Sequence, residues 1–397
     1  MNDKKFEAAI SQYKTPFYLF DTDILTEQIK KIRAAIGAEV ELCYAMKANP
    51  FLIKELEGIV DSFEVCSPGE FHICERAAIQ MDKIVMSGVY KNAKDIHYAL
   101  KEYGNQIIYT VESISHWRIL EDYANSHQLT IKVLLRLTSG NQFGMDEAIL
   151  RQIIKETMEK STDATYIDLE GIQFFSGTQK KVPEKVKKEL VMLDKFCQAL
   201  KEDYGFTVKK LEYGPGLPIC YFEEEEDAAD AMLSALSDAL RALTFRGKIS
   251  LEMGRFIAAP CGSYVTSVVD TKTNKGQNYC IVDGGMHHVN YYGQMLAMKK
   301  PPILHWSQGE GEEQEWTVCG SLCTVNDVLV KQYPLHGLAA GDKLIFEKVG
   351  AYSVTEGISL FLSRELPQVL LYSEKDNLKQ ARGNYPTDLL NYFVKNN

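Results

Sequence analysis

Short apolar runs alternate with amphipathic stretches through the first two thirds of the chain. The runs are typical of buried parallel strands, and the stretches between them repeat apolar positions every three or four residues, as helices do. The eight runs cover residues 40–48, 62–67, 83–88, 106–112, 130–138, 167–177, 209–214 and 248–256, and the clearest helical stretches cover 146–158, 186–200 and 227–243. Eight successive strand–helix units predict an α/β fold, a (β/α)8 TIM barrel over residues 25–260. An open doubly wound sheet also alternates, but the polar or glycine-rich residues that follow the strands favour the barrel.

The pattern changes after about residue 260. The later apolar runs predict strands without long helices between them, at residues 263–271, 277–282, 315–318, 327–329 and 343–347. We therefore expect a C-terminal all-β domain over residues 261–397. The short apolar segment 16–20 precedes the barrel repeat, so residues 1–24 are expected to join this β-domain and complete it.

Composition narrows the class of protein. The 397 residues are 45% hydrophobic and 25% charged, which is ordinary for a soluble globular chain. A net charge of -10 disfavours nucleic acids and anionic membranes as partners. No apolar stretch is long enough to span a bilayer, and we expect no leader because the polar start Met1–Lys5 is not followed by an apolar segment. Nine cysteines occur singly, mostly in apolar runs, which predicts reduced thiols in a cytoplasm. No Cys/His cluster has zinc spacing, so no metal site is expected.

The most informative residue is Lys47, which ends the first apolar run and is followed at once by the turn-forming pair Asn49-Pro50. This position predicts one amine at the C-terminal mouth of a buried strand. A lysine there is costly unless its amine is deprotonated or used covalently, and a Schiff base with pyridoxal phosphate is one such use. A surface lysine at a strand end is the alternative.

Other strands also end in polar or glycine-rich residues, and barrel active sites lie at that end. Glu64, Arg136 and Glu252 lie in the second, fifth and eighth runs. The turns 176–178 and 214–216 each follow a strand, where backbone N–H groups can bind a phosphate.

Several motifs together resemble the fold-type III pyridoxal-phosphate decarboxylases, which include the ornithine, arginine and diaminopimelate enzymes. They are Tyr-Ala-Met-Lys-Ala-Asn-Pro, Glu-Val-Cys-Ser-Pro-Gly-Glu, Glu-Met-Gly-Arg, Val-Asp-Gly-Gly-Met, Gly-Ser-Leu-Cys and Gly-Ala-Tyr. They occur in the order that the family has. The resemblance therefore implies the family's barrel and β-domain, pyridoxal 5'-phosphate as the cofactor, and decarboxylation as the reaction.

The resemblance also implies residue roles. Lys47 would bind the cofactor covalently, Glu252 would pair with its pyridine nitrogen, and Cys323 would donate a proton to the carbon that loses CO2. In this family that cysteine acts across a homodimer interface. The remaining cofactor-binding residues that the resemblance implies are Glu64, Arg136, Phe175, Thr178, Gly214, Gly216, Arg255 and Tyr352.

Some positions depart from the family pattern. Phe175 stands where a histidine usually stacks on the cofactor, and Pro215 removes one N–H from a turn of three glycines. The residue after Cys323 is an acid in the ornithine and diaminopimelate enzymes, where it binds the distal amine of the substrate, but here it is Thr324. A buried ammonium needs a compensating charge that a hydroxyl does not supply. We therefore expect Thr324 and Asp327 to bind a substrate whose far end is not a simple cation.

One branch of the family shares this change. Leu322–Asp327, Val282–His288, Gln142–Glu147 and Gly177–Gln179 resemble the branch that decarboxylates a glutamyl group on an acyl carrier protein, as in butirosin biosynthesis. The side-chain carboxyl of that substrate is consumed in a thioester, which leaves no distal charge. His287 and His288 are not expected to bind a metal, because adjacent residues on a strand point to opposite faces.

The sequence thus favours a cytoplasmic α-decarboxylase of an amino acid or carrier-tethered amino acid, with a homodimer and an acyl carrier protein as candidate partners. A decarboxylase of a free amino acid or of a siderophore-precursor conjugate, a racemase and a non-catalytic relative are the alternatives. Lysines 180, 181, 185, 187 and 188 could form a basic docking patch for an acidic carrier, although such runs are usually solvated helix starts.

Overall fold

The computed structural model describes residues 4–160, 166–307 and 309–393 of the chain. Contacts divide the chain into two compact units. The barrel unit consists of Ile29–Pro218 and Ala228–Phe256, and the β-unit of Met1–Gln28, Ile219–Asp227 and Ile257–Asn397. The sequence assigned residues 219–227 to the barrel, but this segment belongs to the β-unit. There Glu223 accepts a hydrogen bond from the Tyr333 hydroxyl at 2.7 Å.

The barrel unit contains a closed barrel of eight parallel strands, as the sequence predicts. Each strand lies inside the apolar run that predicted it. The strands are β2 (Glu41–Ala45), β3 (Ser62–Val65), β4 (Ile84–Met86), β5 (Ile108–Val111), β6 (Ile131–Leu137), β7 (Ile167–Phe175), β8 (Lys210–Gly214) and β9 (Lys248–Met253). The first strand, β2, pairs with both β3 and β9, so the ring closes there.

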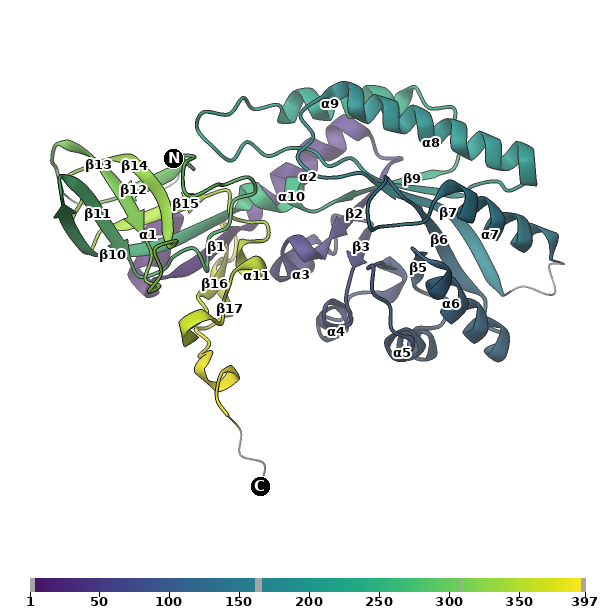
Figure 1. Ribbon diagram of the computed structural model, residues 1–397, viewed down its shortest axis with the longest axis horizontal. Helices are drawn as coiled ribbons and strands as arrows, with labels where there is room; N and C mark the ends of the chain where they lie inside the picture. Colours follow the sequence, from purple (N-terminus) through teal and green to yellow (C-terminus); the bar gives the residue numbers. More distant parts are fainter. Residues whose placement is uncertain (1–3, 161–165, 308, 394–397) are drawn as a thin grey trace. The chain divides into compact units, whose positions relative to one another are not determined.

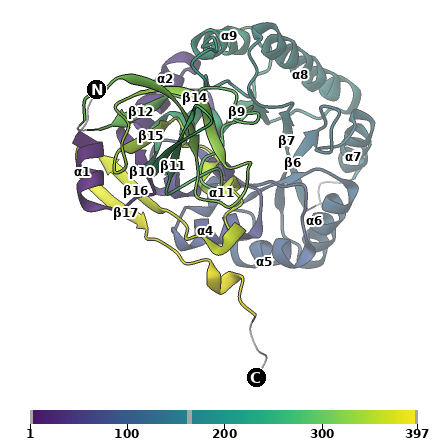
Figure 2. The ribbon, with the colours of Figure 1, turned by 60° about the vertical axis from the view of Figure 1, so that its left-hand side comes forward.

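Helices surround the barrel strands on the outside (Figure 2). Those labelled there are α2 (Thr22–Ile36), α4 (Pro68–Arg76), α5 (Ala93–Tyr103), α6 (Ile114–His127), α7 (Glu147–Glu159), α8 (Pro183–Tyr204) and α9 (Ala229–Arg241). Two short helices, α3 (Ile53–Leu56) and α10 (Arg255–Ala258), follow β2 and β9 in the chain. Local sequence fixes where several of them begin. Ser67, Asn92 and Ser113 are the N-caps of α4, α5 and α6, and each side chain accepts a hydrogen bond from a backbone N–H of the first turn. No helix in the described part of the chain is long and apolar enough to cross a membrane.

The β-unit is built on a nine-stranded sheet (Figure 1). Its strands are β1 (Phe17–Asp21), β10 (Gly262–Asn274), β11 (Gln277–Val282), β12 (Ile303–Trp306), β13 (Glu313–Cys319), β14 (Val328–His336), β15 (Lys343–Glu347), β16 (Gln368–Ser373) and β17 (Asn377–Arg382). The N-terminal strand β1 lies inside this sheet, antiparallel to β10 and parallel to β16. This confirms that an N-terminal strand completes the C-terminal domain. Strands β12, β16 and β17 are additions to the prediction.

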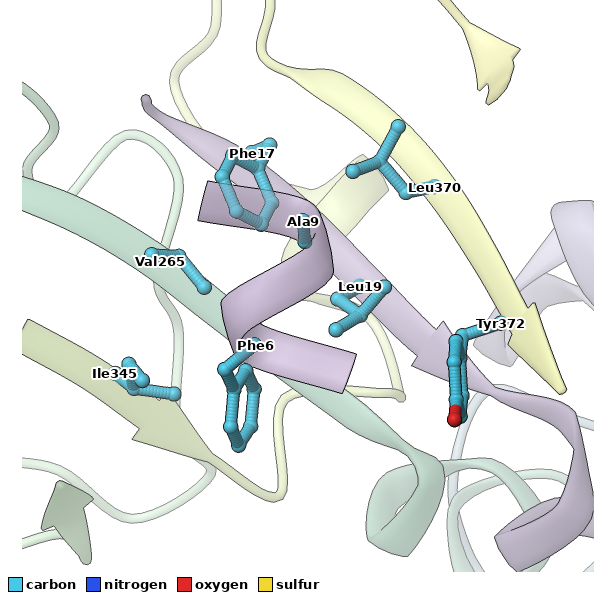
Figure 3. Close-up of a cluster of buried hydrophobic side chains, with 8 residues drawn as sticks. All are labelled: Phe6, Ala9, Phe17, Leu19, Val265, Ile345, Leu370 and Tyr372. Carbon is cyan, nitrogen blue, oxygen red and sulfur yellow. The ribbon is translucent and has the colours of Figure 1, made fainter. Parts of the chain in front are cut away.

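The N-terminal helix α1 (Lys4–Gln12) packs on this sheet (Figure 3). Its Phe6 and Ala9 form one buried cluster with side chains of β1, β10, β15 and β16; these are Phe17, Leu19, Val265, Ile345, Leu370 and Tyr372. The cluster joins segments from both ends of the chain. The sequence did not predict α1, since only two of its residues are fully buried.

Replacing Phe6 by Ala should therefore lower the free energy of unfolding of the β-unit by about 3–5 kcal/mol, the usual cost of removing a buried aromatic side chain. The matched control is Ser11→Ala on the exposed side of α1, which should change it by less than about 0.5 kcal/mol. Urea unfolding measures both. Equal stability of the two variants would contradict the packing of α1 on the sheet.

Candidate active site

A tight turn places Lys47 at the C-terminal end of the first barrel strand. Strand β2 ends at Ala45, and a 3-10 turn, Met46–Ala48, follows directly. The Asn49 side chain accepts a hydrogen bond from the N–H of Phe51 at 3.1 Å, and the Tyr44 hydroxyl donates to the Asn49 carbonyl at 3.0 Å. These bonds fix the backbone on both sides of Lys47, so the Asn-Pro pair is part of what positions the amine.

The Lys47 amine lies between two carboxylates. Its Nζ is 2.8 Å from Glu64 Oε2 on β3 and 3.3 Å from Glu252 Oε1 on β9. Both strands are hydrogen-bonded neighbours of β2, so closure of the barrel brings the three side chains together. The sequence argument expected a buried amine, but the Lys47 side chain is 40% exposed. Its charge is balanced by these carboxylates as well as by solvent.

The two carboxylates share a proton. Burial and the neighbouring Glu64 charge raise the pKa of Glu252 to about 8, while Lys47 contributes in the opposite direction. For Glu64 burial alone would raise the pKa, but the Lys47 charge and hydrogen bonds from Glu252 and Lys47 outweigh it and lower the pKa to about 2. Near neutral pH, Glu64 is therefore ionised and Glu252 holds the proton, so Glu252 can accept a cationic partner in the proton's place.

Arg136 on β6 adds a positive charge that acts on Glu64. Its guanidinium is 3.3 Å from the carboxylate of Glu112 and stacks over the Phe143 ring at 4.9 Å. The Arg136 charge also contributes to lowering the pKa of Glu64. Arg136 therefore supports the ionised state of Glu64.

The two glycine turns lie against each other. Gly216 has a φ of +62°, and a Cβ there would lie 2.0 Å from the carbonyl oxygen of Gly177. A Cβ on Gly214 would lie 2.4 Å from the Phe175 ring. The Arg255 Nε donates to the Thr178 hydroxyl at 3.4 Å. Phe175, Thr178, Gly214, Gly216 and Arg255 thus form one cradle with backbone N–H groups and a cation, which suits a phosphate.

Sequence reasoning missed a carboxylate that supports this cradle. Glu189 of α8 accepts hydrogen bonds from Ser176 Oγ at 2.5 Å, Lys180 Nζ at 2.7 Å and Tyr213 OH at 2.6 Å. It joins the strands β7 and β8 to the helix between them. Lys180 is buried in this ion pair, so it is not part of the surface patch that the lysine run suggested.

Sequence reasoning gave no role to three further residues of the barrel unit. Cys66 Sγ lies 3.8 Å from Lys47 Nζ, and Glu70 accepts a hydrogen bond from the N–H of Cys66 at 2.6 Å. The spacing Ser67-x-x-Glu70 is a helix-capping signal that could have identified Glu70. Lys91 follows β4 and is buried, which lowers its pKa to about 8.

In the β-unit, Cys323 is exposed in a turn between β13 and β14, and Thr324 follows it. The sequence assigned Asp327 to the substrate, but its carboxylate is buried and accepts hydrogen bonds from the N–H groups of Met286 and Leu322, both at 2.7 Å. Asp327 therefore fixes the backbone of the Cys323 turn. Tyr352 lies at the N-cap of α11 (Ser353–Glu356) with a φ of +69°.

The two adjacent histidines differ from the prediction. His287 and His288 lie in a turn after β11, not on a strand, and their rings lie 3.7 Å apart instead of on opposite faces. The His288 Nδ1 is 2.8 Å from the Tyr264 hydroxyl. Burial lowers the pKa of both side chains, and that of His287 to about 4. Among the described residues, no group of three or more His, Cys, Asp and Glu side chains could hold a metal ion.

Comparison with known proteins places this site in a family. A family model described as the pyridoxal-binding domain of pyridoxal-dependent decarboxylases matches residues 22–259. The chain belongs to the pyridoxal-dependent decarboxylases. It is thus a carboxy-lyase whose cofactor is pyridoxal phosphate.

Relatives of this decarboxylase differ in their substrates. The chain is 25% identical to the L-glutamyl-[BtrI acyl-carrier protein] decarboxylase of Niallia circulans, over 94% of this chain and 92% of that protein. It is 28% identical to the diaminopimelate decarboxylase of Helicobacter pylori strain J99, over 87% and 88%. The crystal structure of a diaminopimelate decarboxylase from Helicobacter pylori with L-lysine matches with a TM-score of 0.80 and 26% identity, over 97% and 98%. The fold is thus shared, and the substrate is not decided by the comparisons.

The barrel residues of this decarboxylase fit the cofactor. Pyridoxal phosphate has an aldehyde, a basic ring nitrogen and a phosphate. Lys47 offers an amine. Glu252 offers a carboxyl group whose pKa is raised to about 8 although Lys47 lies 3.3 Å away, and the glycine turns offer a cradle that a Cβ would fill. The chain therefore carries one suitable group for each part of the cofactor.

The Glu252 pKa predicts how cofactor-free protein responds to pH. Folding raises this pKa from 4.5 to about 8. Between these values folded Glu252 keeps a proton that the unfolded chain has released, so the stability of the fold falls as pH rises through this window. Glu252→Gln removes this titration. We expect the variant to be more stable than the wild type by about 1–3 kcal/mol at pH 8, and the difference to shrink toward pH 5.

Urea unfolding of cofactor-free protein between pH 5 and 8 measures this difference. The matched control is Glu55→Gln on the exposed side of α3, which also removes one glutamate. A stability difference for Glu252→Gln that does not change with pH would contradict the shared proton.

Proposed function

We propose that this decarboxylase removes the α-carboxyl group of an amino acid whose side chain ends without a cation. A glutamyl thioester on an acyl carrier protein is the leading candidate. The observation that carries this proposal is the turn holding Cys323. Of residues 320–327 only Asp327 is acidic, and its carboxylate accepts hydrogen bonds from the backbone. A substrate ammonium beside Thr324 would lack a compensating charge.

We propose the following division of roles. Lys47 binds the cofactor through its amine, Glu252 keeps the ring nitrogen of the cofactor protonated, and the Gly214–Gly216 turn with Arg255 and Thr178 binds the phosphate. Phe175 would pack against the ring, while Glu64 and Arg136 would balance the charge around Lys47. Tyr352 assists at the phosphate. When bound, the cofactor accepts the electron pair that remains on the substrate as CO2 departs. The Cys323 thiol then supplies a proton to the carbon that has lost CO2.

We also propose a homodimer as the working form, in the reducing environment of the cytoplasm. The β-unit exposes large apolar side chains, including Leu296 at 79% and Val325 at 94%, and both line the same hollow. Exposed apolar groups of this kind mark interaction surfaces. All nine cysteines are free thiols. For a carrier protein, Lys185 and Lys188 at the exposed start of α8 provide local positive charge on a chain of net charge -10.

A decarboxylase acting on a free amino acid, such as a diaminopimelate decarboxylase, is the second candidate. The similarity to the Helicobacter pylori enzyme supports it. Thr324 distinguishes the two candidates, because a diamino acid brings a second ammonium to the site.

The assignment of Lys47 can be tested directly. Borohydride reduction of the cofactor-loaded enzyme should attach the cofactor irreversibly to Lys47, because the amine lies at the mouth of the barrel between two carboxylates. Mass spectrometry of the digested protein locates the adduct. Lys47→Arg keeps the charge but should abolish the adduct. An adduct on a different lysine in the wild type would disprove the assignment.

The substrate proposal predicts a selectivity. The kcat/KM for CO2 release should be higher for a glutamyl-pantetheine thioester than for ornithine or diaminopimelate. The difference should correspond to about 2–5 kcal/mol of activation free energy, the cost of an unpaired buried charge. Thr324→Asp should narrow this difference, and Thr324→Ser, which keeps the hydroxyl, is the matched control. Efficient turnover of diaminopimelate by the wild type would instead establish the second candidate.

A further inference from the structure

The barrel unit contains a cavity of about 390 Å³ between α4 and α5. This volume lies within the range of ligand pockets, about 300–1,000 Å³. All residues that line it belong to the barrel unit, at the C-terminal ends of β3 and β4 where barrel active sites lie. The family roles described above use none of the residues that form its apolar walls, which are Pro68, Phe71, Met86, Ile96 and Tyr98.

The cavity adjoins the reactive lysine. Cys66 lines the cavity, and its Sγ lies 3.8 Å from Lys47 Nζ. At the other side, Tyr90 and Lys94 line it and are exposed, Tyr90 at 78%. The cavity therefore extends from Cys66, which contacts the amine, to the exposed residues Tyr90 and Lys94. A substrate that ends a few atoms beyond its reacting carbon has no need of such a space, whereas a tethered substrate continues outward.

Lys91 places a positive charge inside the cavity. It is 8% exposed, and its Nζ donates to the Gly88 carbonyl at 2.8 Å and lies 3.5 Å from the Thr110 hydroxyl. It forms no ion pair with any carboxylate in the described part of the chain. A buried ammonium in this position is stabilised by further oxygen acceptors. Amide carbonyls and phosphate oxygens are such acceptors.

The walls of the cavity are held in place by a second carboxylate. Glu75 of α4 accepts hydrogen bonds from His72 Nδ1 at 2.5 Å, Tyr98 OH at 2.9 Å and Tyr103 OH at 2.7 Å. Two of these donors, His72 and Tyr98, also line the cavity. Because these bonds join α4 to α5, the space between the helices exists before a ligand arrives, which reduces the entropic cost of binding.

We propose that this cavity binds the phosphopantetheine arm of a carrier-tethered substrate, an inference that rests on the proposed function. The apolar walls suit the dimethyl segment of the arm, Lys91 suits its amide carbonyls, and Lys94 at the rim suits its phosphate. The cavity would thus bind the tether, while Thr324 would select against a substrate with a distal ammonium.

Binding of S-methyl-phosphopantetheine to the cofactor-loaded enzyme, measured by isothermal titration calorimetry, tests the assignment without turnover. The wild type should bind the probe, and Lys91→Met should raise Kd about tenfold, as expected for loss of a charge-assisted hydrogen bond. Lys94→Met should raise Kd severalfold at low salt and less at high salt. The matched control is Lys101→Met, which removes an exposed lysine of the same helix outside this cavity.

Tyr90→Ala at the exposed rim keeps the test informative should Lys91→Met fail to fold, and it too should weaken binding. No binding by the wild type at millimolar probe overturns the proposal, as does a Kd that none of the three cavity variants changes. The absence of binding by the wild type would follow if a second copy of the chain covered the cavity. A failure of the proposed function can be distinguished from a failure of this assignment. It would show that the enzyme releases no CO2 from any thioester, whatever the result of the binding measurements.

Discussion

The site depends on one amine held between two carboxylates. Lys47 follows the first barrel strand, Glu64 lies on the second and Glu252 on the last, and they meet because β2 pairs with both β3 and β9. Glu252 is 205 residues from Lys47 in sequence, so only a closed barrel brings them together. One lysine cannot balance two ionised carboxylates, and the second carboxyl group keeps a proton. This imbalance costs stability in the empty site, and it suits the protonated ring nitrogen that we propose as the partner of Glu252.

Supporting carboxylates determine where the reactive groups lie. Glu189 fixes the strand ends beside the phosphate cradle, Glu75 fixes the helices around the cavity, and Asp327 fixes the turn that carries Cys323. Each accepts hydrogen bonds from two or three donors on separate segments, and multiple bonds to one charged group are strong and directional. The reactive residues themselves lie in turns. Within each unit, the residues proposed to react are therefore positioned by carboxylates that take no part in the proposed chemistry.

The sequence revealed the barrel because each strand is a short apolar run bounded by polar residues, a signal that needs no long-range information. It missed β17, whose residues are mostly exposed and polar, and α1, which buries two side chains. For the candidate site, motif order pointed to Lys47, Glu252 and the two glycine turns, and the fold brings Lys47 against Glu252 and one glycine turn against the other. Glu189 and Lys91 could not be found in this way, because a helix glutamate and a loop lysine acquire roles only through contacts made in the folded chain. The structural role of Asp327 was not predicted, because its backbone partners are invisible in sequence.

The position of Asp327 bears on the substrate selectivity that we propose for Thr324. Its carboxylate holds Met286 and Leu322, so the turn keeps its shape whatever residue stands at position 324. Thr324 makes a local bond from its N–H to the Leu322 carbonyl, which any residue except proline can make. The Thr324 hydroxyl accepts one long hydrogen bond, from the N–H of Asn326 at 3.4 Å, and a carboxylate at this position could accept the same bond. If one residue sets selectivity and another fixes the turn, relatives can keep the fold and differ in substrate. The relatives at 25% and 28% identity, a glutamyl-[acyl-carrier protein] decarboxylase and a diaminopimelate decarboxylase, fit this separation.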